Sequence, residues 1–282
     1  MDLTAVNVHA ICWCRSESHR YGKFTMESSQ PSRYHAPALE KGLDILELLA
    51  RSDESLSRLE IAQSLGRTPS ETYRMLTTLV QRGYVLKDIK GDGYQLSLTL
   101  FALAHSHPPL NRLISRAQPL MRSLAQEIQQ SCHLCIEENG QIVVVASVQS
   151  PGYWGIALRP GSILGLYNTG SGHILAAFRS RTELDQLISS HQLVDGEMPT
   201  VREEFDDTLD RVRSAGYEQV PSRTAVGVTN IGYPVFGPNR TAVAALMCPY
   251  LERIDAHTSP GVEFVRSKMA ELAGSLSLDA RI

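Results

Sequence analysis

The sequence predicts an α+β protein in two parts, a small winged helix-turn-helix and then a larger sheet covered by helices. Two observations predict this class. Between Ser57 and Leu96, two runs with apolar residues at helical spacing precede two short β-prone runs. After residue 113, β-prone and helical segments alternate, and turn residues separate them. Helices packed on a mostly antiparallel sheet are the economical assembly for such a mixture.

Residues 57–65 predict the first short amphipathic helix, because their apolar side chains fall close to one helical stripe. Gly66 comes next, a residue suited to a helix C-terminus. The second helix has a strong start signal. Thr68 supplies an N-cap hydroxyl, Pro69 stands at the first helical position, and Glu71 at N3 completes a capping box.

The second helix is expected to be amphipathic, with an exposed face that suits the reading of bases. Its inward residues are Thr72, Met75, Leu76, Leu79 and Val80. Its outward residues are Ser70, Tyr73, Arg74, Thr77 and Gln81. Hydroxyl, amide and guanidinium groups on one face can bond to base edges. A two-helix corner can also be plain packing, so the segment after the second helix has to distinguish the two interpretations.

Two β-prone runs, 83–86 and 94–96, come after the second helix. The segment between them contains Gly91 and Gly93, which permit the positive φ of a hairpin tip. A helix-turn-helix joined to such a wing is much less often accidental than a helical corner alone. The pattern therefore favours a DNA-binding unit.

The net charge of −3 argues weakly against nucleic-acid binding, because affinity for DNA comes mostly from neutralised phosphates. Local placement matters more than the total. Basic residues gather on the second helix and the wing: Arg67, Arg74, Arg82, Lys87 and Lys90. Acidic residues of the preceding segment, Glu40, Asp44 and Glu47, are expected to face away from that stripe.

The stretch from Ala38 to Leu100 resembles the N-terminal winged-helix domain of the IclR family of bacterial transcriptional regulators. Residues 70–85 match that family's recognition helix and first wing strand nearly position by position. Weaker motifs continue the resemblance to about residue 278, and their order and spacing are specific. They are Gly161-Ser162, residues 169–172, Gly216-Tyr217, Gly227-Val228 and residues 234–236.

The resemblance implies a GAF-like effector-binding domain after the winged helix. The expected organisation is a disordered leader over residues 1–35, a winged helix-turn-helix over 36–97, a linker helix over 98–112 and the effector-binding domain over 113–282. The residues expected to contact double-stranded DNA are Arg67, Thr68, Ser70, Glu71, Tyr73, Arg74, Thr77, Gln81, Lys87 and Lys90.

The linker helix is expected to be interrupted at Pro108-Pro109, and Pro119 implies a kink or a restart in the next helix. Further on, Asn139-Gly140 between two β-prone runs predicts a tight hairpin. Thr200 to Glu203 reads as a second capping box, which opens a helix that Gly216 closes. Further strands are expected over 217–220, 228–236 and 241–247, and a final helix over 257–276.

In the family the effector sits in a cavity of the C-terminal domain, which places several residues of this chain around a ligand. The expected effector-binding residues are Gly161, Ser162, Thr169, Gly170, Val220, Asn230, Met247 and Pro249. Val220, Met247 and Pro249 stand where polar side chains can occur in the family, so the resemblance implies a less polar effector, such as an organic or aromatic acid with a ring and one polar end. Two structural alternatives stay open: an ordinary helix cap at Thr169 and a backbone-satisfying role for Asn230.

Other chemistry-bearing candidates fail on geometry. Cys132 and Cys135 have a zinc-like spacing, but on a strand an offset of three sends the two sulfurs to opposite faces. Ser171 and His173 lie about 200 degrees apart around a helix, which excludes a nucleophile and base pair. We expect no metal, no cofactor and no catalytic residues, and five cysteines imply no disulfide framework in the cytoplasm.

The sequence thus predicts a cytoplasmic transcriptional regulator, because no apolar run approaches the roughly 18 residues of a membrane span and the N-terminus lacks a secretory layout. One winged helix covers few base pairs, so we expect a homodimer or homotetramer on a near-palindromic operator. The competing interpretation is a ligand-binding enzyme or redox sensor whose winged helix makes protein contacts.

Overall fold

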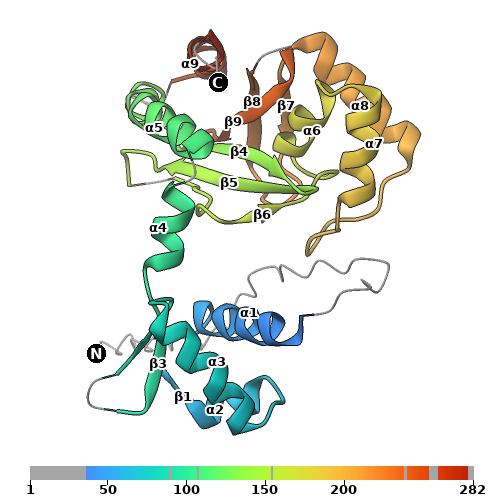
Figure 1. Cartoon of the computed structure of the whole chain (residues 1–282). Coiled ribbons are helices and arrows are strands. Elements are labelled where there is room, and N and C mark those ends of the chain that lie inside the picture. Colours follow the sequence, from blue (N-terminus) through green and yellow to red (C-terminus); the bar gives the residue numbers. More distant parts are fainter. Residues whose placement is uncertain are drawn as a thin grey trace, which may run out of the picture.

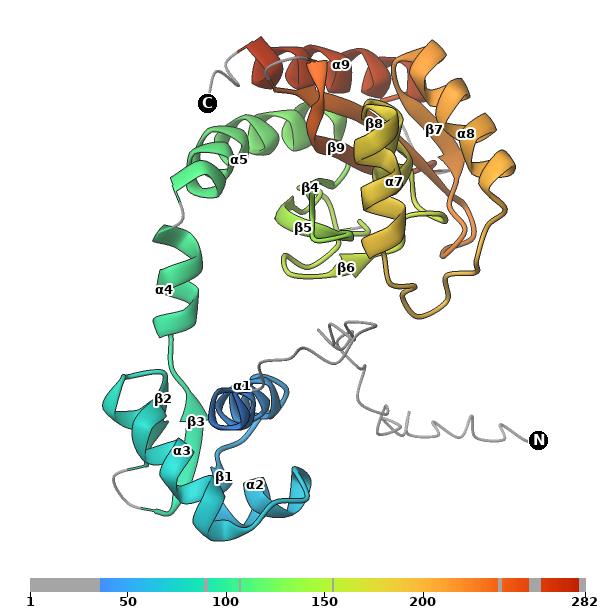
Figure 2. The same cartoon turned by 45° about the vertical axis from the view of Figure 1, so that its right-hand side comes forward.

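The computed structural model describes residues 36–88, 91–106, 108–153, 155–237, 240–253 and 260–278. Its helices and strands form an N-terminal and a C-terminal group, and helix α4 (Thr99–Ser106) connects them (Figure 1). The turned view separates the two groups clearly (Figure 2). The predicted disordered leader and Lys90 lie outside the described residues.

The N-terminal group is a winged helix-turn-helix, as predicted. Its elements are α1 (Pro37–Ala50), β1 (Leu56–Ser57), α2 (Arg58–Ser64), α3 (Pro69–Gln81), β2 (Val85–Lys87) and β3 (Gly93–Leu96). The strands form an antiparallel sheet in the order β1-β3-β2, of which the sequence pattern did not predict β1. Side chains from the helices and the sheet make one core: Ile45, Leu49, Ile61, Leu76, Val85 and Tyr94.

Local capping signals define the ends of α2 and α3. The predicted capping box at α3 is present, because the Glu71 amide donates to Thr68 Oγ1 and the Thr68 amide donates to the Glu71 carboxylate. Gly66 adopts φ +61° directly after α2, which confirms its role at the helix end. A second box, between Ser57 and Glu60, opens α2 and was not predicted.

The expected interruption of the linker helix at the two prolines is confirmed, but the next helix begins at them rather than after them. Helix α4 ends at Ser106, and α5 (Pro108–Ile128) begins at the first of the two prolines. Proline is tolerated at this position because the first amide of a helix has no intrahelical acceptor. Pro119 lies inside α5 without ending it, so of the two expected outcomes, a kink or a restart, the restart does not occur.

The C-terminal group is built on one antiparallel sheet with strand order β6-β5-β4-β9-β8-β7. Its strands are β4 (Cys132–Glu138), β5 (Gln141–Val148), β6 (Ile163–Leu164), β7 (Glu218–Pro221), β8 (Val228–Phe236) and β9 (Ala242–Leu251). Its other helices are α6 (Gly170–Ala177), α7 (Arg181–Ser190), α8 (Arg202–Ala215) and α9 (Val262–Leu278). Most of the predicted strands are confirmed, whereas β6 was missed and β9 is longer than expected.

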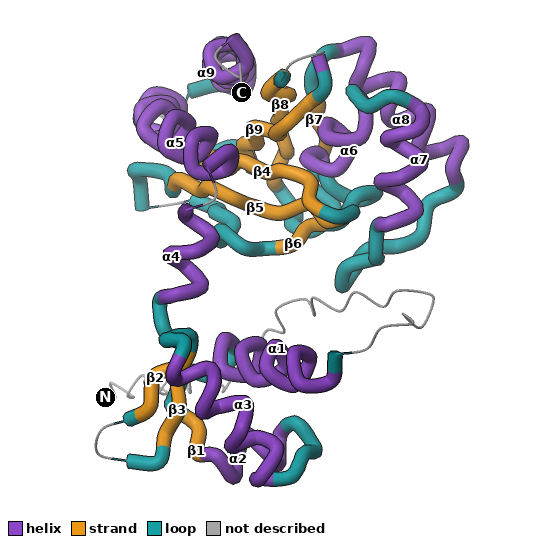
Figure 3. The backbone as a smooth tube through the Cα atoms, viewed as in Figure 1, coloured by secondary structure: helices purple, strands orange, loops and turns teal. Residues whose placement is uncertain are grey.

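Helices cover both faces of this sheet (Figure 3). On one face α5 and α9 pack on Leu134, Ile231 and Leu246. On the other face α6 to α8 pack on Ala245 and Met247. The two faces therefore belong to two separate cores, and a strand residue can be assigned to a face by the core it joins.

Two local predictions in this group had opposite outcomes. Asn139 and Gly140 have φ values of +50° and +81°, as a two-residue hairpin turn requires. The capping box at Thr200 does not form, because Val201 is the N-cap of α8 and makes no side-chain cap bond. Glu203 consequently falls one position short of N3. Gly216 closes the helix at φ +78°, as predicted.

Candidate functional site

The outward face of α3 carries the predicted base-reading residues. Ser70, Tyr73, Arg74 and Gln81 are exposed, while Thr72 and Leu76 are buried. Thr77 is half-buried, and its hydroxyl donates to the Tyr73 carbonyl oxygen (2.8 Å). The predicted amphipathicity of α3 is therefore confirmed.

Two ion pairs join α1 to the start of α3. Nζ of Lys41 lies 2.8 Å from Oε1 of Glu71, and the Arg67 guanidinium donates to the Asp44 carboxylate. Asp44 was expected to face away from the basic residues of α3 and the wing. Instead, its carboxylate neutralises one of them, Arg67. The Lys41 hydrogen bond and the Thr68 cap hold the pKa of Glu71 down at about 2, so this carboxylate is charged at neutral pH.

The other basic residues of α3 and the wing differ in whether an acidic side chain pairs with them. Lys87 lies 3.8 Å from Asp92 and over the ring of Tyr94, near the end of β2. Among the described residues, Arg74 and Arg82 have no acidic partner. Because Arg74 lies on the exposed face of α3, its guanidinium is free to bond to a base edge or a phosphate.

The tyrosine on this face also has a defined neighbour. The Arg58 guanidinium carbon lies 5.5 Å from the centre of the Tyr73 ring, within the range of a cation–π contact. Tyr73 is about half exposed. The aromatic ring of Tyr73 in α3 and the positive charge of Arg58 in α2 therefore lie side by side on the same surface.

Five of the expected effector-binding residues meet at one place on the C-terminal sheet. Asn230 pairs with Val220 on one side and with Pro249 on the other. A Cβ atom added at Gly170 would lie 3.0 Å from Cε of Met247 and 3.9 Å from Cβ of Asn230. The start of α6 therefore rests directly on this patch of β8 and β9.

The other three expected residues are placed differently. Gly161 and Ser162 exchange backbone hydrogen bonds with Val144 of β5, beside the opposite edge of the sheet from β7. Thr169 acts as the N-cap of α6, where its Oγ1 accepts from the Gly172 amide (3.1 Å) and donates to the Gly165 carbonyl oxygen (2.6 Å). An ordinary cap therefore accounts for Thr169.

Asn230 is half-buried, and its side-chain amide has no hydrogen-bond partner among the described residues. Its neighbours on this face, Met247 and Pro249, are buried and apolar. The Asn230 amide, which can both donate and accept a hydrogen bond, is thus the polar group among apolar neighbours on this face of the sheet. Sequence reasoning found this residue through the family resemblance.

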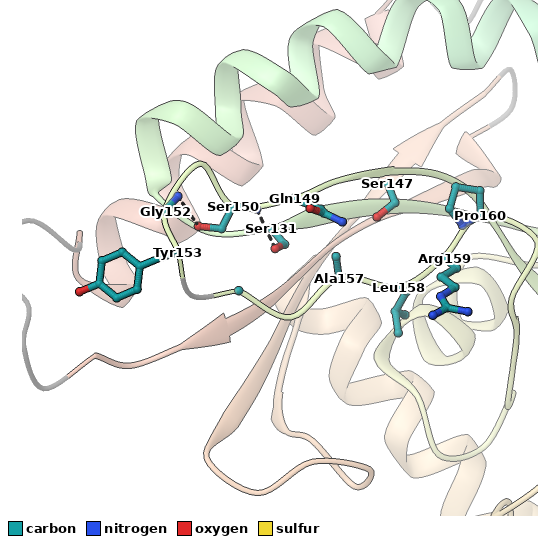
Figure 4. Close-up of a pocket in the computed structure, with 11 residues that line it drawn as sticks. Ser131, Ser147, Gln149, Ser150, Gly152, Tyr153, Ala157, Leu158, Arg159 and Pro160 are labelled. Carbon is teal, nitrogen blue, oxygen red and sulfur yellow. Dashed lines mark hydrogen bonds between the residues drawn. The ribbon is translucent and has the colours of Figure 1, made fainter. Parts of the chain in front are cut away.

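A separate cavity of about 490 Å³ lies where β4 begins and β5 ends. Ser131, Ser147 and Gln149 line its sheet side, and the segment from Ala157 to Pro160 lies across from them (Figure 4). None of the expected effector-binding residues lines this cavity. Apart from Ser131, its lining residues come from one continuous stretch, residues 147–160, which the sequence analysis did not single out.

Two buried histidines brace the loop that enters α6. His173 lies with Nδ1 2.8 Å from Glu218 and Nε2 3.0 Å from the Tyr167 carbonyl oxygen. Glu197 accepts from the Tyr167 amide (2.7 Å) and lies 2.9 Å from Nε2 of His191. Tyr167 is therefore held at its amide and at its carbonyl. His173 does not approach Ser171, which confirms that these two residues form no nucleophile and base pair.

The cysteines of the sheet are inert in chemical terms. Cys132 joins the core on the α5 and α9 face and Cys135 the core on the α6 face, as strand geometry predicted. Burial raises the pKa of both thiols to about 12, so neither forms a thiolate at neutral pH. Among the described residues no three His, Cys, Asp or Glu side chains are grouped as metal ligands, and none of the described helices is long and apolar enough to cross a membrane.

A winged helix with an exposed polar recognition face, joined by a helix to a separate α/β domain, defines the class of DNA-binding regulators that carry their own effector domain. The family models agree with this class. Residues 38–88 match the IclR helix-turn-helix domain, and residues 110–258 match the bacterial transcriptional regulator IclR C-terminal domain. The chain therefore belongs to the IclR family, and it is a transcriptional regulator rather than an enzyme.

Individual relatives cover nearly the whole protein. The chain is 26% identical to a glycerol operon regulatory protein of Streptomyces griseus over 86% of its own length and 95% of that protein. It is 27% identical to the transcriptional regulator KdgR of Escherichia coli, with 86% and 89% covered. An IclR homologue from Microbacterium hydrocarbonoxydans, solved with 4-hydroxybenzoate, superposes with a TM-score of 0.71 at 20% identity, covering 86% of this chain and 99% of that one.

Proposed function

We propose that this regulator binds a near-palindromic operator as a homodimer or homotetramer, and that a small organic acid held in its C-terminal domain changes its affinity for that operator. The observation that carries the DNA half of the proposal is the outward face of α3. Arg74 is exposed there without an acidic partner among the described residues, next to Tyr73 and Ser70.

The same surface supports different roles for the other predicted contacts. Arg74 and Gln81 are suited to base edges, and Ser70 and the wing residue Lys87 to phosphates. Arg67, Thr68 and Glu71 act indirectly, because their side chains form the cap and the ion pairs that orient α3. We therefore expect fewer residues to contact the operator directly than the sequence alone suggests.

Exposed leucines support the oligomer. Leu39 and Leu43 on α1 are 64% and 49% exposed, and Leu98, just before α4, is 80% exposed. Large apolar side chains gathered on two neighbouring segments are typical of a surface that a partner covers. A second copy of the chain fits this role, because two recognition helices would then read the two halves of a near-palindrome.

The effector half of the proposal depends on Asn230. Its unpaired amide, with Val220, Met247 and Pro249 around it, suits a ligand that presents one polar group and some apolar area. The relative solved with 4-hydroxybenzoate holds an aromatic acid, whose ring supplies apolar area beside its polar groups. We propose the same general class, a small organic or aromatic acid, for this chain, and a cytoplasmic location where operator and metabolite are both accessible.

Electrophoretic mobility shifts with genomic fragments in excess competitor DNA test the proposal. The parent should retain one fragment preferentially, that fragment should contain a near-palindrome, and an organic acid should change the retention. Light scattering at the same protein concentration should show a dimer or a larger species. Uniform retention of all fragments, or a monomer that binds the operator, would contradict it.

A further inference from the structure

One basic residue of the winged helix borders the recognition face but was not among the residues expected to contact DNA. Arg58 is the first residue of α2, and its side chain is exposed. Its guanidinium carbon lies 5.5 Å from the centre of the Tyr73 ring, which belongs to the outward face of α3. Helices α2 and α3 pack against each other in both views of the chain (Figure 1, Figure 2).

The charge of Arg58 has no acidic partner among the described residues. Glu60, the acidic residue of α2, accepts from the Ser57 amide (2.8 Å) and belongs to the capping box of that helix. Glu71, at the start of α3, pairs with Lys41. Both carboxylates next to this surface are therefore engaged elsewhere, and the Arg58 guanidinium is available to an anion from outside the domain.

Tyr73 holds this guanidinium beside the recognition residues. The tyrosine lies one helical turn from Ser70 and from Thr77, so its ring is on the same side of α3 as they are. A cation over an aromatic face is attracted to it and loses part of its rotamer freedom before any ligand binds. The N–H donors of a guanidinium lie in the plane of the group, where phosphate oxygens can still reach them.

The general geometry of a helix-turn-helix identifies the anion. The second helix lies in the major groove and contacts base edges with its N-terminal part, while the first helix crosses the phosphate backbone. Tyr73 lies in the N-terminal half of α3 (Pro69–Gln81), and Arg58 approaches it from α2. The guanidinium is consequently directed to the edge of the groove, where the phosphates are.

We propose that Arg58 binds a phosphate of the DNA backbone at the edge of the groove that α3 enters, and that Tyr73 is its positioning residue. Arg58 supplies the charge, and the ring of Tyr73 keeps that charge at a fixed place relative to α3. This inference rests on the proposed operator binding and adds a contact from α2 to it.

The salt dependence of DNA binding tests the proposal, because each neutralised phosphate contributes about −0.9 to the slope of log affinity against log salt. Fluorescence anisotropy of the full chain on a labelled duplex of mixed sequence measures this slope between about 50 and 200 mM salt. Arg58→Gln should reduce its magnitude by about one and weaken binding roughly fivefold at about 150 mM salt. The genomic fragment retained in mobility shifts should show the same loss, since a phosphate carries no sequence information.

Variants of the pair separate the charge from its positioning. Arg58→Lys keeps the charge and should keep the slope of the parent. Tyr73→Phe keeps the ring and should bind like the parent, whereas Tyr73→Leu should bind roughly two- to fivefold more weakly, as expected for the loss of an exposed cation–π contact. In an Arg58→Gln background, Tyr73→Leu should cause no further loss, because the ring acts through the guanidinium.

Arg223→Gln is the matched control, since it removes an exposed arginine charge from the C-terminal group and should keep the slope and the affinity of the parent. Arg58→Gln should also melt at the temperature of the parent, because the capping box of α2 uses Ser57 and Glu60 and not Arg58. A lower affinity of Arg58→Gln can then be assigned to the lost contact with DNA.

Three results would overturn the inference. In the first, Arg58→Gln keeps the slope of the parent. In the second, its loss is confined to the retained fragment, which would assign Arg58 to a base edge. In the third, Tyr73→Leu weakens binding equally with and without Arg58, which would end the positioning role. A parent that binds no duplex at any of these salt concentrations contradicts the proposed function itself.

Discussion

The carboxylate of Glu71 accepts a hydrogen bond from the backbone amide of Thr68, the N-cap of α3, and also lies 2.8 Å from Nζ of Lys41 in α1. The first turn of α3 is thereby tied both to its own N-cap and to α1. A recognition helix must hold a fixed angle to the rest of its domain if its side chains are to meet successive bases. This ion pair and the Arg67 to Asp44 pair supply two such ties.

Arg74→Ala should weaken specific operator binding by about 1 to 3 kcal/mol if the guanidinium contacts a base edge in bidentate fashion. Binding curves on the operator and on a scrambled duplex measure this. Arg223→Ala, which removes an exposed charge from the C-terminal group, serves as the control and should leave both curves unchanged. A uniform loss on both duplexes would assign Arg74 to phosphate, and no loss on either would remove it from the interface.

Thr68→Ala should lower the local stability of the winged helix by roughly 0.5 to 2 kcal/mol, because the N-cap hydroxyl that accepts from the Glu71 amide is lost. Amide hydrogen exchange in the core around Leu76 reports the local free energy of opening. Thr78→Ala is the matched control, since its hydroxyl bonds only within α3 and alanine favours the helix. Equal protection in Thr68→Ala and the parent would show that the cap contributes nothing.

Lys41→Met should raise the pKa of Glu71 from about 2 toward its ordinary value of 4.5, because the Lys41 hydrogen bond is the largest cause of the lowering. A depressed carboxyl pKa stabilises the fold above pH 4.5, and this contribution is lost as the pH falls toward 2. Carbon NMR titration of the Glu71 carboxyl measures the shift. An unchanged titration midpoint in Lys41→Met would mean that the ion pair does not form in solution.

The stability of the C-terminal group should fall as the pH rises above the ordinary histidine pKa of 6.5, because the pKa of His191 is raised. Burial alone would lower the pKa of His191, but hydrogen bonds to Glu197 and to the Gly140 carbonyl oxygen raise it more. Both ring nitrogens face acceptors, so the imidazolium is the form that fits. A raised histidine pKa stabilises fully below about pH 6.5, and this contribution is lost as the pH passes the raised value.

Thermal melting of the parent and of His191→Asn across that range measures this dependence. The parent should lose melting temperature as the pH rises through the raised pKa of His191, and the variant should lose less. The pKa of Glu197 is lowered, so its stabilisation of the fold is present above its ordinary pKa of 4.5 and is lost as the pH falls below that value. The His191 and Glu197 pair should therefore also weaken at acid pH. Parallel melting curves for the two proteins would contradict the assignment of the imidazolium.

Asn230→Leu should weaken the response of operator affinity to the effector while ligand-free operator binding stays near that of the parent. A ligand shifts an equilibrium only by its difference in affinity between the two states, so the loss of one polar contact reduces the shift. Thr229→Val alters the next residue of β8 and is expected to change neither quantity. An unchanged response in Asn230→Leu would assign its amide a structural role.

Features confined to a few neighbouring residues were predicted from the sequence alone. The capping box at Thr68, the helix end at Gly66, the hairpin at Asn139-Gly140 and the opposite faces of Cys132 and Cys135 all depend on backbone geometry over two to four positions. The failed box at Thr200 and the helix start at Pro108 show the limit of such signals. The N-cap of α8 lies one residue beyond Thr200, and α5 begins at the two prolines rather than after them, because the surrounding packing selects which of several adjacent residues begins a helix.

Only the tertiary structure decided which distant residues meet. The partners of the Arg67 to Asp44 and Lys41 to Glu71 hydrogen bonds are 23 and 30 residues apart, and no local pattern pairs them. His133, Ser147 and Met247 share a face only because β4 lies between β5 and β9 in a defined register. Periodicity predicts which side of an element is buried, whereas the order and register of the strands determine which side chains form a site.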